Sequence, residues 1–186
     1  MMRRTPDTVN MQTDFLQPSH MAEAQGQASL AAPSGSAKSW RAISLWQPWA
    51  SAMGSGVKKN ETRSWPTSYR GELVICSAKR KPSREEVGGG ETYDVAMRMP
   101  YGCAICVVEL YDCRGVEWVS RQPNFTEAES DLGDYTPGIG RYAWMTRNCR
   151  TLTTPLPIIG RQGLWILTPE IVANIKALLP NEKGQR

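Results

Sequence analysis

The stretch Gly56-Val57-Lys58-Lys59-Asn60-Glu61-Thr62-Arg63-Ser64-Trp65 places four charged side chains and a tryptophan within ten positions. Side chains alternate between the two faces of an extended chain, so we expect the odd-numbered residues from Lys59 to Trp65 to share one face. Lys58 would begin the other face unless the turn at Gly56 redirects it. Charges this close can form ion pairs, and enclosure would shift the pKa values of the pair members and suit the lysine to proton transfer. The alternative is a solvated strand whose ion pairs each contribute only about 0–1 kcal/mol.

Strands and short helices are predicted on both sides of this stretch. Alternating and β-branched segments favour strands at residues 40–45, 73–76, 103–111, 142–146 and 163–167, with an extended segment at 59–65. A short helix is predicted after Gln47, and a terminal helix is predicted to begin at Thr168-Pro169-Glu170. Residues 82–94 are interpreted as a helical turn followed by a loop. Several short strands with few helices predict an α+β fold built on a small β-barrel flanked by short helices.

Composition and length indicate one folded domain with flexible ends. The chain has 186 residues, of which 40% are hydrophobic and 22% charged, enough for one domain and additional segments. We expect a flexible leader at residues 1–38, because this part is rich in Gln, Ser, Ala, Met and Pro without periodicity. The folded domain is predicted at 39–180 and a tail at 181–186. The chain contains neither an apolar run of about 18 residues nor a secretory signal, which predicts a cytoplasmic protein without membrane contact.

The charge distribution favours a polyanionic partner. The formal net charge is +4, and the leader is neutral, so the whole surplus lies in residues 39–186. The long acidic segment 115–140 is predicted to be a loop that borders an anion-binding groove without crossing it.

Catalysis by histidine and metal binding are not expected. The single histidine, His20, lies in the predicted leader, which excludes Ser-His-Asp and Cys-His catalysis in the folded part. Cys103-x-x-Cys106 has no second ligand pair at zinc-finger spacing, and on a strand its two thiols would point to opposite faces. We therefore expect these cysteines to pack in the core, and we expect no metal and no cofactor. Glu109 shares a strand face with Cys103; if that face is the barrel interior, the carboxylate needs a partner such as Lys58 or Arg63.

Three motifs, in this order, resemble those of the ASCH family, which has a PUA-like β-barrel: Leu45-Trp-Gln47-Pro-Trp49-Ala-Ser51, Gly56-x-Lys58-x-x-Glu61-x-Arg63-Ser64-Trp65 and Tyr69-Arg70-Gly71-Glu-Leu73. Later segments at 102–113 and 157–165 fit the remaining strands, so the resemblance covers about residues 40–167. It implies a cleft between the barrel and the first helix that accommodates RNA, DNA or a modified nucleoside. The polar floor of this cleft would consist of Lys58, Glu61, Arg63 and Glu109.

Further site residues follow from the same implied cleft. Gln47 and Ser64 would supply hydrogen bonds. Aromatic rings can stack on bases, and this role is assigned to Trp65 first, with Tyr69 and Trp49 as further candidates. Cationic side chains would hold phosphate, with affinity that falls as salt rises; the candidates are Arg70, Lys79 and Arg141.

The resemblance also leaves an enzymatic alternative open, because some ASCH proteins are ribonucleases and one bacterial member removes the acetyl group from N4-acetylcytidine. In this hydrolase hypothesis Lys58 activates water or a ribose hydroxyl, the two glutamates hold it, and Arg63 stabilises the developing negative charge. The chain is similar to that amidohydrolase at Lys58 and Glu109, but has Glu61 where the enzyme has a nucleophilic threonine. A protein-interaction adaptor is a third hypothesis, and the sequence leaves the oligomeric state undecided.

Overall fold

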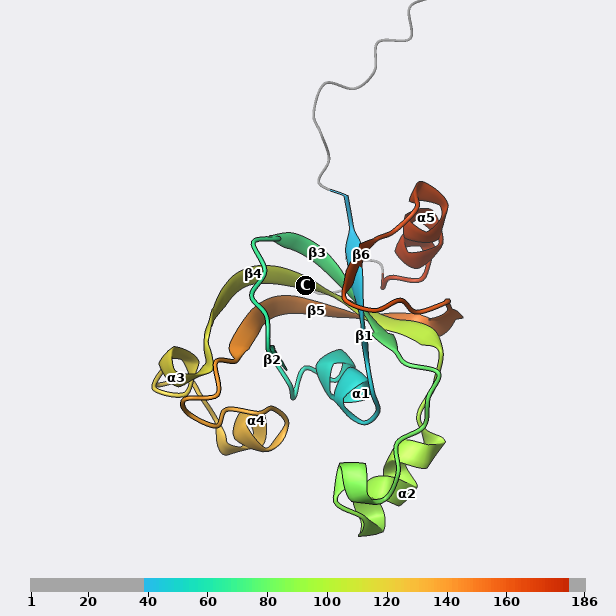
Figure 1. Ribbon diagram of the computed structural model, residues 1–186. Helices are drawn as coiled ribbons and strands as arrows, with labels where there is room; N and C mark the ends of the chain where they lie inside the picture. The colour runs from blue at the N-terminus through green and yellow to red at the C-terminus, as the bar shows by residue number, and fades with distance from the viewer. Residues whose placement is uncertain (1–38, 181–186) are drawn as a thin grey trace, which may run out of the picture. The chain divides into compact units, whose positions relative to one another are not determined.

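The computed structural model describes residues 39–180 and shows one mixed sheet that curls into a half-barrel (Figure 1). The strand order is β2-β5-β4-β3-β1-β6. Their bounds are β1 (Arg41–Leu45), β2 (Asn60–Arg63), β3 (Gly71–Ser77), β4 (Cys103–Gly115), β5 (Tyr142–Pro157) and β6 (Leu164–Ile166). All predicted strands are therefore present, and the predicted α+β fold with a barrel-like sheet and short helices is confirmed, the sheet forming a half-barrel. The predicted leader and tail lie outside the described residues.

Strand pairing explains the curvature of the sheet. β1 runs parallel to β3, whereas every other neighbouring pair is antiparallel. The two longest strands, β4 and β5, pair along most of their length with three shifts of register. Such bulges bend a strand and increase its twist, so β4 and β5 can wrap from one end of the half-barrel to the other.

Two helices cover opposite faces of this sheet (Figure 1). On one face, Ala50 and Met53 of α1 (Trp49–Gly54) pack in a core cluster that also contains Trp144. On the other face, Ile175 of α5 (Pro169–Ala177) packs in a second cluster with strand residues such as Val107. Both sides of the central strands are therefore buried, which is why β3 reads as an almost continuous apolar run.

Close packing of α1 depends on a glycine and on a buried amide side chain. A Cβ on Gly54 would lie 2.8 Å from Cγ2 of Ile105, so a larger residue would push the helix away from β4. Gln47 is fully buried; its Oε1 accepts a hydrogen bond from the Ser51 amide at 3.0 Å, and its Nε2 donates to the Pro100 carbonyl at 2.8 Å. Both polar ends of Gln47 are thus used within the fold, and its expected role toward a ligand is not supported by its position.

Two segments predicted as loops contain helices. The glycine run 88–90 does not begin a loop, because Gly88 and Gly89 adopt positive φ angles that join the 3-10 helix η1 (Glu85–Val87) to α2 (Gly90–Arg98). The acidic segment 115–140 contains α3 (Val116–Val119) and α4 (Glu127–Asp131). The helical turn predicted within 82–94 is present as η1, but the loop predicted after it and the loop predicted at 115–140 were wrong, because short helices leave little periodicity in the sequence.

Candidate functional site

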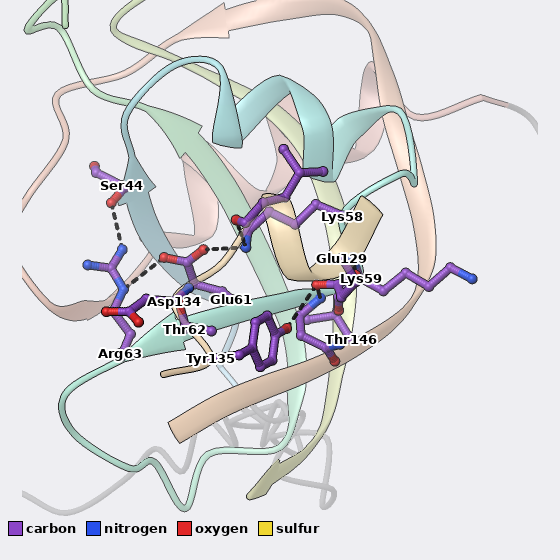
Figure 2. Close-up of polar contacts among 12 residues, drawn as sticks. Ser44, Lys58, Lys59, Glu61, Thr62, Arg63, Glu129, Asp134, Tyr135 and Thr146 are labelled. Atoms are coloured by element: carbon purple, nitrogen blue, oxygen red, sulfur yellow. Dashed lines mark hydrogen bonds and ion pairs between the residues drawn. The ribbon is translucent and has the colours of Figure 1, made fainter. Parts of the chain in front are cut away.

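Three charged residues of the motif at 56–65 form a continuous chain of ion pairs (Figure 2). Lys58 is only 2% exposed, and its Nζ lies 2.7 Å from the Leu132 carbonyl oxygen and 3.5 Å from Oε2 of Glu61. The other carboxylate oxygen of Glu61 lies 3.1 Å from Nε of Arg63. Arg63 in turn donates from Nη2 to the Ser44 carbonyl of β1 at 3.1 Å. These ion pairs and the final hydrogen bond therefore join β2 to β1, a strand with which β2 does not pair in the sheet.

The turn after α1 directs Lys58 inward. Gly56 has a φ of +75°, which glycine adopts without strain, and the Lys58 amide donates to the Ala52 carbonyl at 3.0 Å. Lys59 is exposed, and its side chain points away from the ion pairs (Figure 2). The expectation that Lys59 and Glu61 share a face is therefore wrong, because the turn places the inward-facing residue one position earlier.

Residues 126–134, which are part of the acidic segment 115–140, are bound along β2, and we call them the strap. The buried carboxylate of Glu129 accepts hydrogen bonds from the amides of Lys59 at 2.7 Å and Asn60 at 2.9 Å, and from the Tyr135 hydroxyl at 3.1 Å. The Asp134 amide donates to the Thr62 hydroxyl at 3.1 Å. Together with the bond from Lys58 to the Leu132 carbonyl, these contacts hold the strap against the start and the middle of β2.

Glu129 was missed by the sequence analysis, although a local signal marks it. Thr126-Glu127-Ala128-Glu129 is a capping-box pattern, and the Thr126 hydroxyl accepts from the Glu129 amide at 3.2 Å as the helix N-cap. In a capping box the glutamate would bond back to the amide of the N-cap residue. Here its carboxylate reaches β2 instead, so the same pattern both begins α4 and attaches it to the site.

A cavity of about 550 Å³, here called the polar cavity, opens between β1, β2, α1 and the strap. Its wall carries two cations, Arg63 and Arg141, and three carboxylates, Glu61, Asp131 and Asp134. Arg141 and Asp134 form an ion pair at 3.2 Å. The remaining lining residues are Ser44, Leu45, Trp46, Trp49, Thr62, Leu132 and Gly133. The cavity therefore offers hydrogen-bond donors, acceptors and aromatic surface together.

The carboxylate of Asp134 stays charged at neutral pH. A hydrogen bond from the Thr136 side chain holds the pKa of Asp134 below its usual range; burial opposes this effect, and the Thr136 amide and Arg141 add to it. The cation of Arg141 is consequently paired with a permanent negative charge on the cavity wall.

A second hollow of about 980 Å³, here called the basic groove, shares Ser44, Trp46 and Arg63 with the polar cavity. Four lining residues are cationic, and no Asp or Glu lines it within the described part of the chain: Arg63, Lys79, Arg80 and Arg161. Its other walls come from β1, the residues that follow β3, Tyr101 and Gly102, and residues 157–163. The guanidinium of Arg80 lies 4.3 Å above the ring of Trp46, which is 42% exposed.

Glu109 does not join this site, and the expectation that Lys58 or Arg63 would be its partner is wrong. Its carboxylate accepts hydrogen bonds from Arg147 at 2.6 and 2.9 Å and from Asn148 at 2.8 Å. The Arg147 hydrogen bonds hold the pKa of Glu109 below its usual range, against a smaller opposing effect of burial. The physical reason is the register shift between Ala104 and Cys106, which breaks the alternation of faces along β4.

The same bulge places Cys103 and Cys106 on one face of the sheet. Cys103 and Cys106 are both buried in the cluster beneath α1, so their predicted place in the core is confirmed. The expectation that they point to opposite faces is wrong. Within residues 39–180, no group of three His, Cys, Asp or Glu residues could hold a metal ion.

Several predicted binding residues lie outside both hollows. Trp65 packs edge-on against Trp144, with ring centroids 4.6 Å apart, and accepts a hydrogen bond from the Trp144 indole at its carbonyl. Tyr69 donates to the Glu72 carbonyl at 2.6 Å, and burial raises the pKa of its hydroxyl. Arg70 is bonded to two nearby carbonyls and to a carboxylate, and Ser64 is exposed without lining either hollow.

The predicted site is thus divided. The structure brings Glu61, Arg63, Trp49 and Arg141 to the polar cavity and places Lys79 in the basic groove. Lys58 lies behind the wall of the polar cavity and lines neither hollow. Trp46 was not assigned to the site from the sequence, because only the fold brings residues 46, 80 and 161 together.

The family model of the ASCH domain matches residues 43–156. The chain belongs to the ASCH family. It is 30% identical to activating signal cointegrator 1 of Homo sapiens and 29% identical to the Mus musculus protein. Each match extends over 138 residues and covers 69% of this chain. The chain spans only about a fifth of the length of these relatives, since the matched part is 22% of each.

Solved structures show the same fold. The ASCH protein of Zymomonas mobilis superimposes with a TM-score of 0.50 at 19% identity, covering 76% of this chain and 96% of that one. A point mutant of the same protein gives a TM-score of 0.50 at 18% identity, with 77% and 100% coverage. In residues 39–180, no helix is long and apolar enough to cross a membrane.

Replacing Lys58 by methionine should destabilise the fold strongly. The change leaves the Leu132 carbonyl without its donor and removes one of the two cations beside the buried carboxylate of Glu61. Breaking a buried ion pair costs about 3–5 kcal/mol, and urea unfolding monitored by tryptophan fluorescence measures this loss. Lys59→Met is the matched control, because Lys59 is exposed and should change the free energy of unfolding by no more than about 0.5 kcal/mol. Equal effects of the two variants would contradict the structural role of Lys58.

Replacing Glu129 by glutamine should loosen the strap. One amide of β2 would then face a side-chain NH₂ group in place of an acceptor oxygen, and an unsatisfied buried donor costs about 1–3 kcal/mol. Glu127→Gln on the same helix is the control, because Glu127 is exposed. Hydrogen exchange of the Lys59 and Asn60 amides reports the loss directly, and protection that is unchanged in Glu129→Gln would refute the attachment.

Proposed function

We propose that this ASCH protein binds RNA, or a modified nucleotide within RNA, by accepting a base in the polar cavity. The observation that carries the proposal is the combination, on one cavity wall, of exposed tryptophan with a fixed pair of donor and acceptor, Arg63 and Glu61. Membership of the ASCH family and the PUA-like fold are consistent with RNA-related binding.

The charges of the cavity suit a base better than a phosphate. Two cations face three carboxylates, so a phosphate would meet more negative than positive charge at the wall. A base is uncharged and presents both donors and acceptors on its edges, and single-stranded RNA exposes these edges for recognition. The carboxylates of Glu61 and Asp131 can accept from amino groups of a base, while the guanidinium of Arg63 can donate to its carbonyl or ring nitrogen atoms.

Aromatic surface is available at the entrance. Trp46 lines both hollows and is 42% exposed, so its ring is accessible to a base. Stacking on such a ring contributes about 1–3 kcal/mol per base and tolerates any sequence. We therefore assign the stacking role, which the sequence had favoured for Trp65, to Trp46 and Trp49.

A hydrolase acting in the same cavity is the second candidate, favoured by the carboxylate of Glu61 directly beside a lysine. Its main requirement is access of the Lys58 ammonium group to a substrate. That group is enclosed between the Leu132 carbonyl and Glu61, and Glu109, the second carboxylate of the hypothesis, is paired with Arg147. A lysine-activated water would need the strap to withdraw first. The geometry therefore supports binding more strongly than catalysis.

Binding should depend on Trp46. Fluorescence anisotropy of a labelled single-stranded RNA octamer at low salt is expected to show saturable binding, and Trp46→Ala should weaken it about 5- to 150-fold, the loss of one stacked base. Trp118→Ala is a matched control, because Trp118 is similarly exposed at 48% and lines neither hollow. The proposal fails if the wild-type protein does not bind, or if the two variants bind equally well.

The enzymatic alternative is separated by product formation. We expect no cleavage of RNA on a gel and no acetate release from N4-acetylcytidine by chromatography, even at high protein concentration, because the Lys58 ammonium group is enclosed. Product in either assay would favour the hydrolase over a binding module. Its loss in Glu61→Gln would then place the chemistry in the polar cavity.

A further inference from the structure

We infer that the basic groove holds the phosphates of the nucleotides next to the base in the polar cavity, so that the ligand is a single-stranded segment and not a free nucleoside. The inference rests on the proposed function and adds the path of the strand. The two hollows share one wall, made by Ser44, Trp46 and Arg63. A strand that places a base on one side of this wall can continue on the other side without leaving the protein surface.

The charges on the two sides of Arg63 differ in the way that this path requires. The strap borders the polar cavity and contributes Asp131 and Asp134, which would repel a phosphate backbone. The basic groove has no carboxylate among its lining residues in the described chain. Lys79 and Arg161 line it without a salt bridge to any residue of the described part, so no carboxylate of residues 39–180 neutralises their positive charge.

The shared wall is itself suited to a nucleotide junction. Arg80 lies over one face of the Trp46 ring and pairs with Glu86 at 2.7 Å, which holds its guanidinium in place. Because Arg80 shares its charge with Glu86, it supports the ring, and we assign the phosphate contacts to Lys79 and Arg161. Single-strand binding sites in proteins combine these two elements, a cationic track and a stacking platform.

The opposite side of the groove is held close by a glycine. A Cβ on Gly160 would lie only 2.6 Å from Oγ of Ser44, so a larger residue at position 160 would require the Ser44 hydroxyl or residues 157–163 to move. The groove is therefore bounded by residues 157–163 on one side and by the shared wall on the other.

Salt dependence separates the groove from the cavity. Phosphate contacts release counterions, and for single strands the slope of log K against log salt is about −0.7 per neutralised phosphate. We expect Lys79→Gln combined with Arg161→Gln to weaken binding of the RNA octamer and to make this slope less steep by about 1.4, measured by anisotropy over a range of NaCl concentrations. The charge-matched control combines Arg121→Gln with Lys176→Gln, two exposed cations that line neither hollow. A slope that changes equally in the two double variants would overturn the inference.

The Trp46→Ala variant distinguishes the two proposals. It removes stacking but no charge, so it should weaken binding while the salt slope remains that of the wild type. If Trp46→Ala weakens binding and the groove variant has the control's slope, the groove inference fails and the proposed function stands. If the groove variant alone weakens binding and flattens the slope, the groove binds phosphate and the assignment of a base to the polar cavity fails.

Discussion

The buried ammonium group of Lys58 is the constraint on which the arrangement of this site depends. A charge that is withdrawn from water must be paired and hydrogen-bonded, because an unpaired buried ion costs far more than the fold can offset. Lys58 finds its partners in Glu61, three residues later, and in the Leu132 carbonyl, 74 residues later. Burial of one side chain therefore requires the strap to lie against β2, and the strap forms one wall of the polar cavity.

Lys58 also influences the position of Arg63, which it does not contact, through the carboxylate of Glu61. By holding one oxygen of Glu61, it leaves the other to orient Arg63, and Arg63 bonds to the carbonyl of Ser44 on β1. Because β2 and β1 do not pair in the sheet, this guanidinium supplies a connection that no backbone ladder makes. The charged groups that face the cavity are consequently fixed before any ligand arrives, which reduces the ordering cost of binding.

The sequence was sufficient for the strands and for the start of the terminal helix at Thr168, since these follow from local patterns. The meeting of Lys58 with Glu61 and Arg63 was implied by the resemblance to ASCH proteins, whereas alternation alone put Lys58 on the other face. The sequence failed where the answer depends on pairing between distant segments. Glu109 was assigned to the interior by counting faces along β4, but the bulge after Ala104 depends on the register with β5. Trp65 was assigned to base stacking from its position in the extended segment, but only the fold shows that Trp144 packs against it.

The division of charge around Arg63 explains how a domain with a small positive net charge can offer a local binding site for a polyanion. The +4 surplus is not spread evenly, since the strap adds carboxylates on one side and the groove gathers cations on the other. A backbone laid along the strap would face like charges, whereas the same backbone in the groove would meet Lys79 and Arg161, which form no salt bridge with the described residues. In the proposed complex, the orientation of the strand would follow from repulsion on one side as much as from attraction on the other, and Arg63 lines both hollows where they meet.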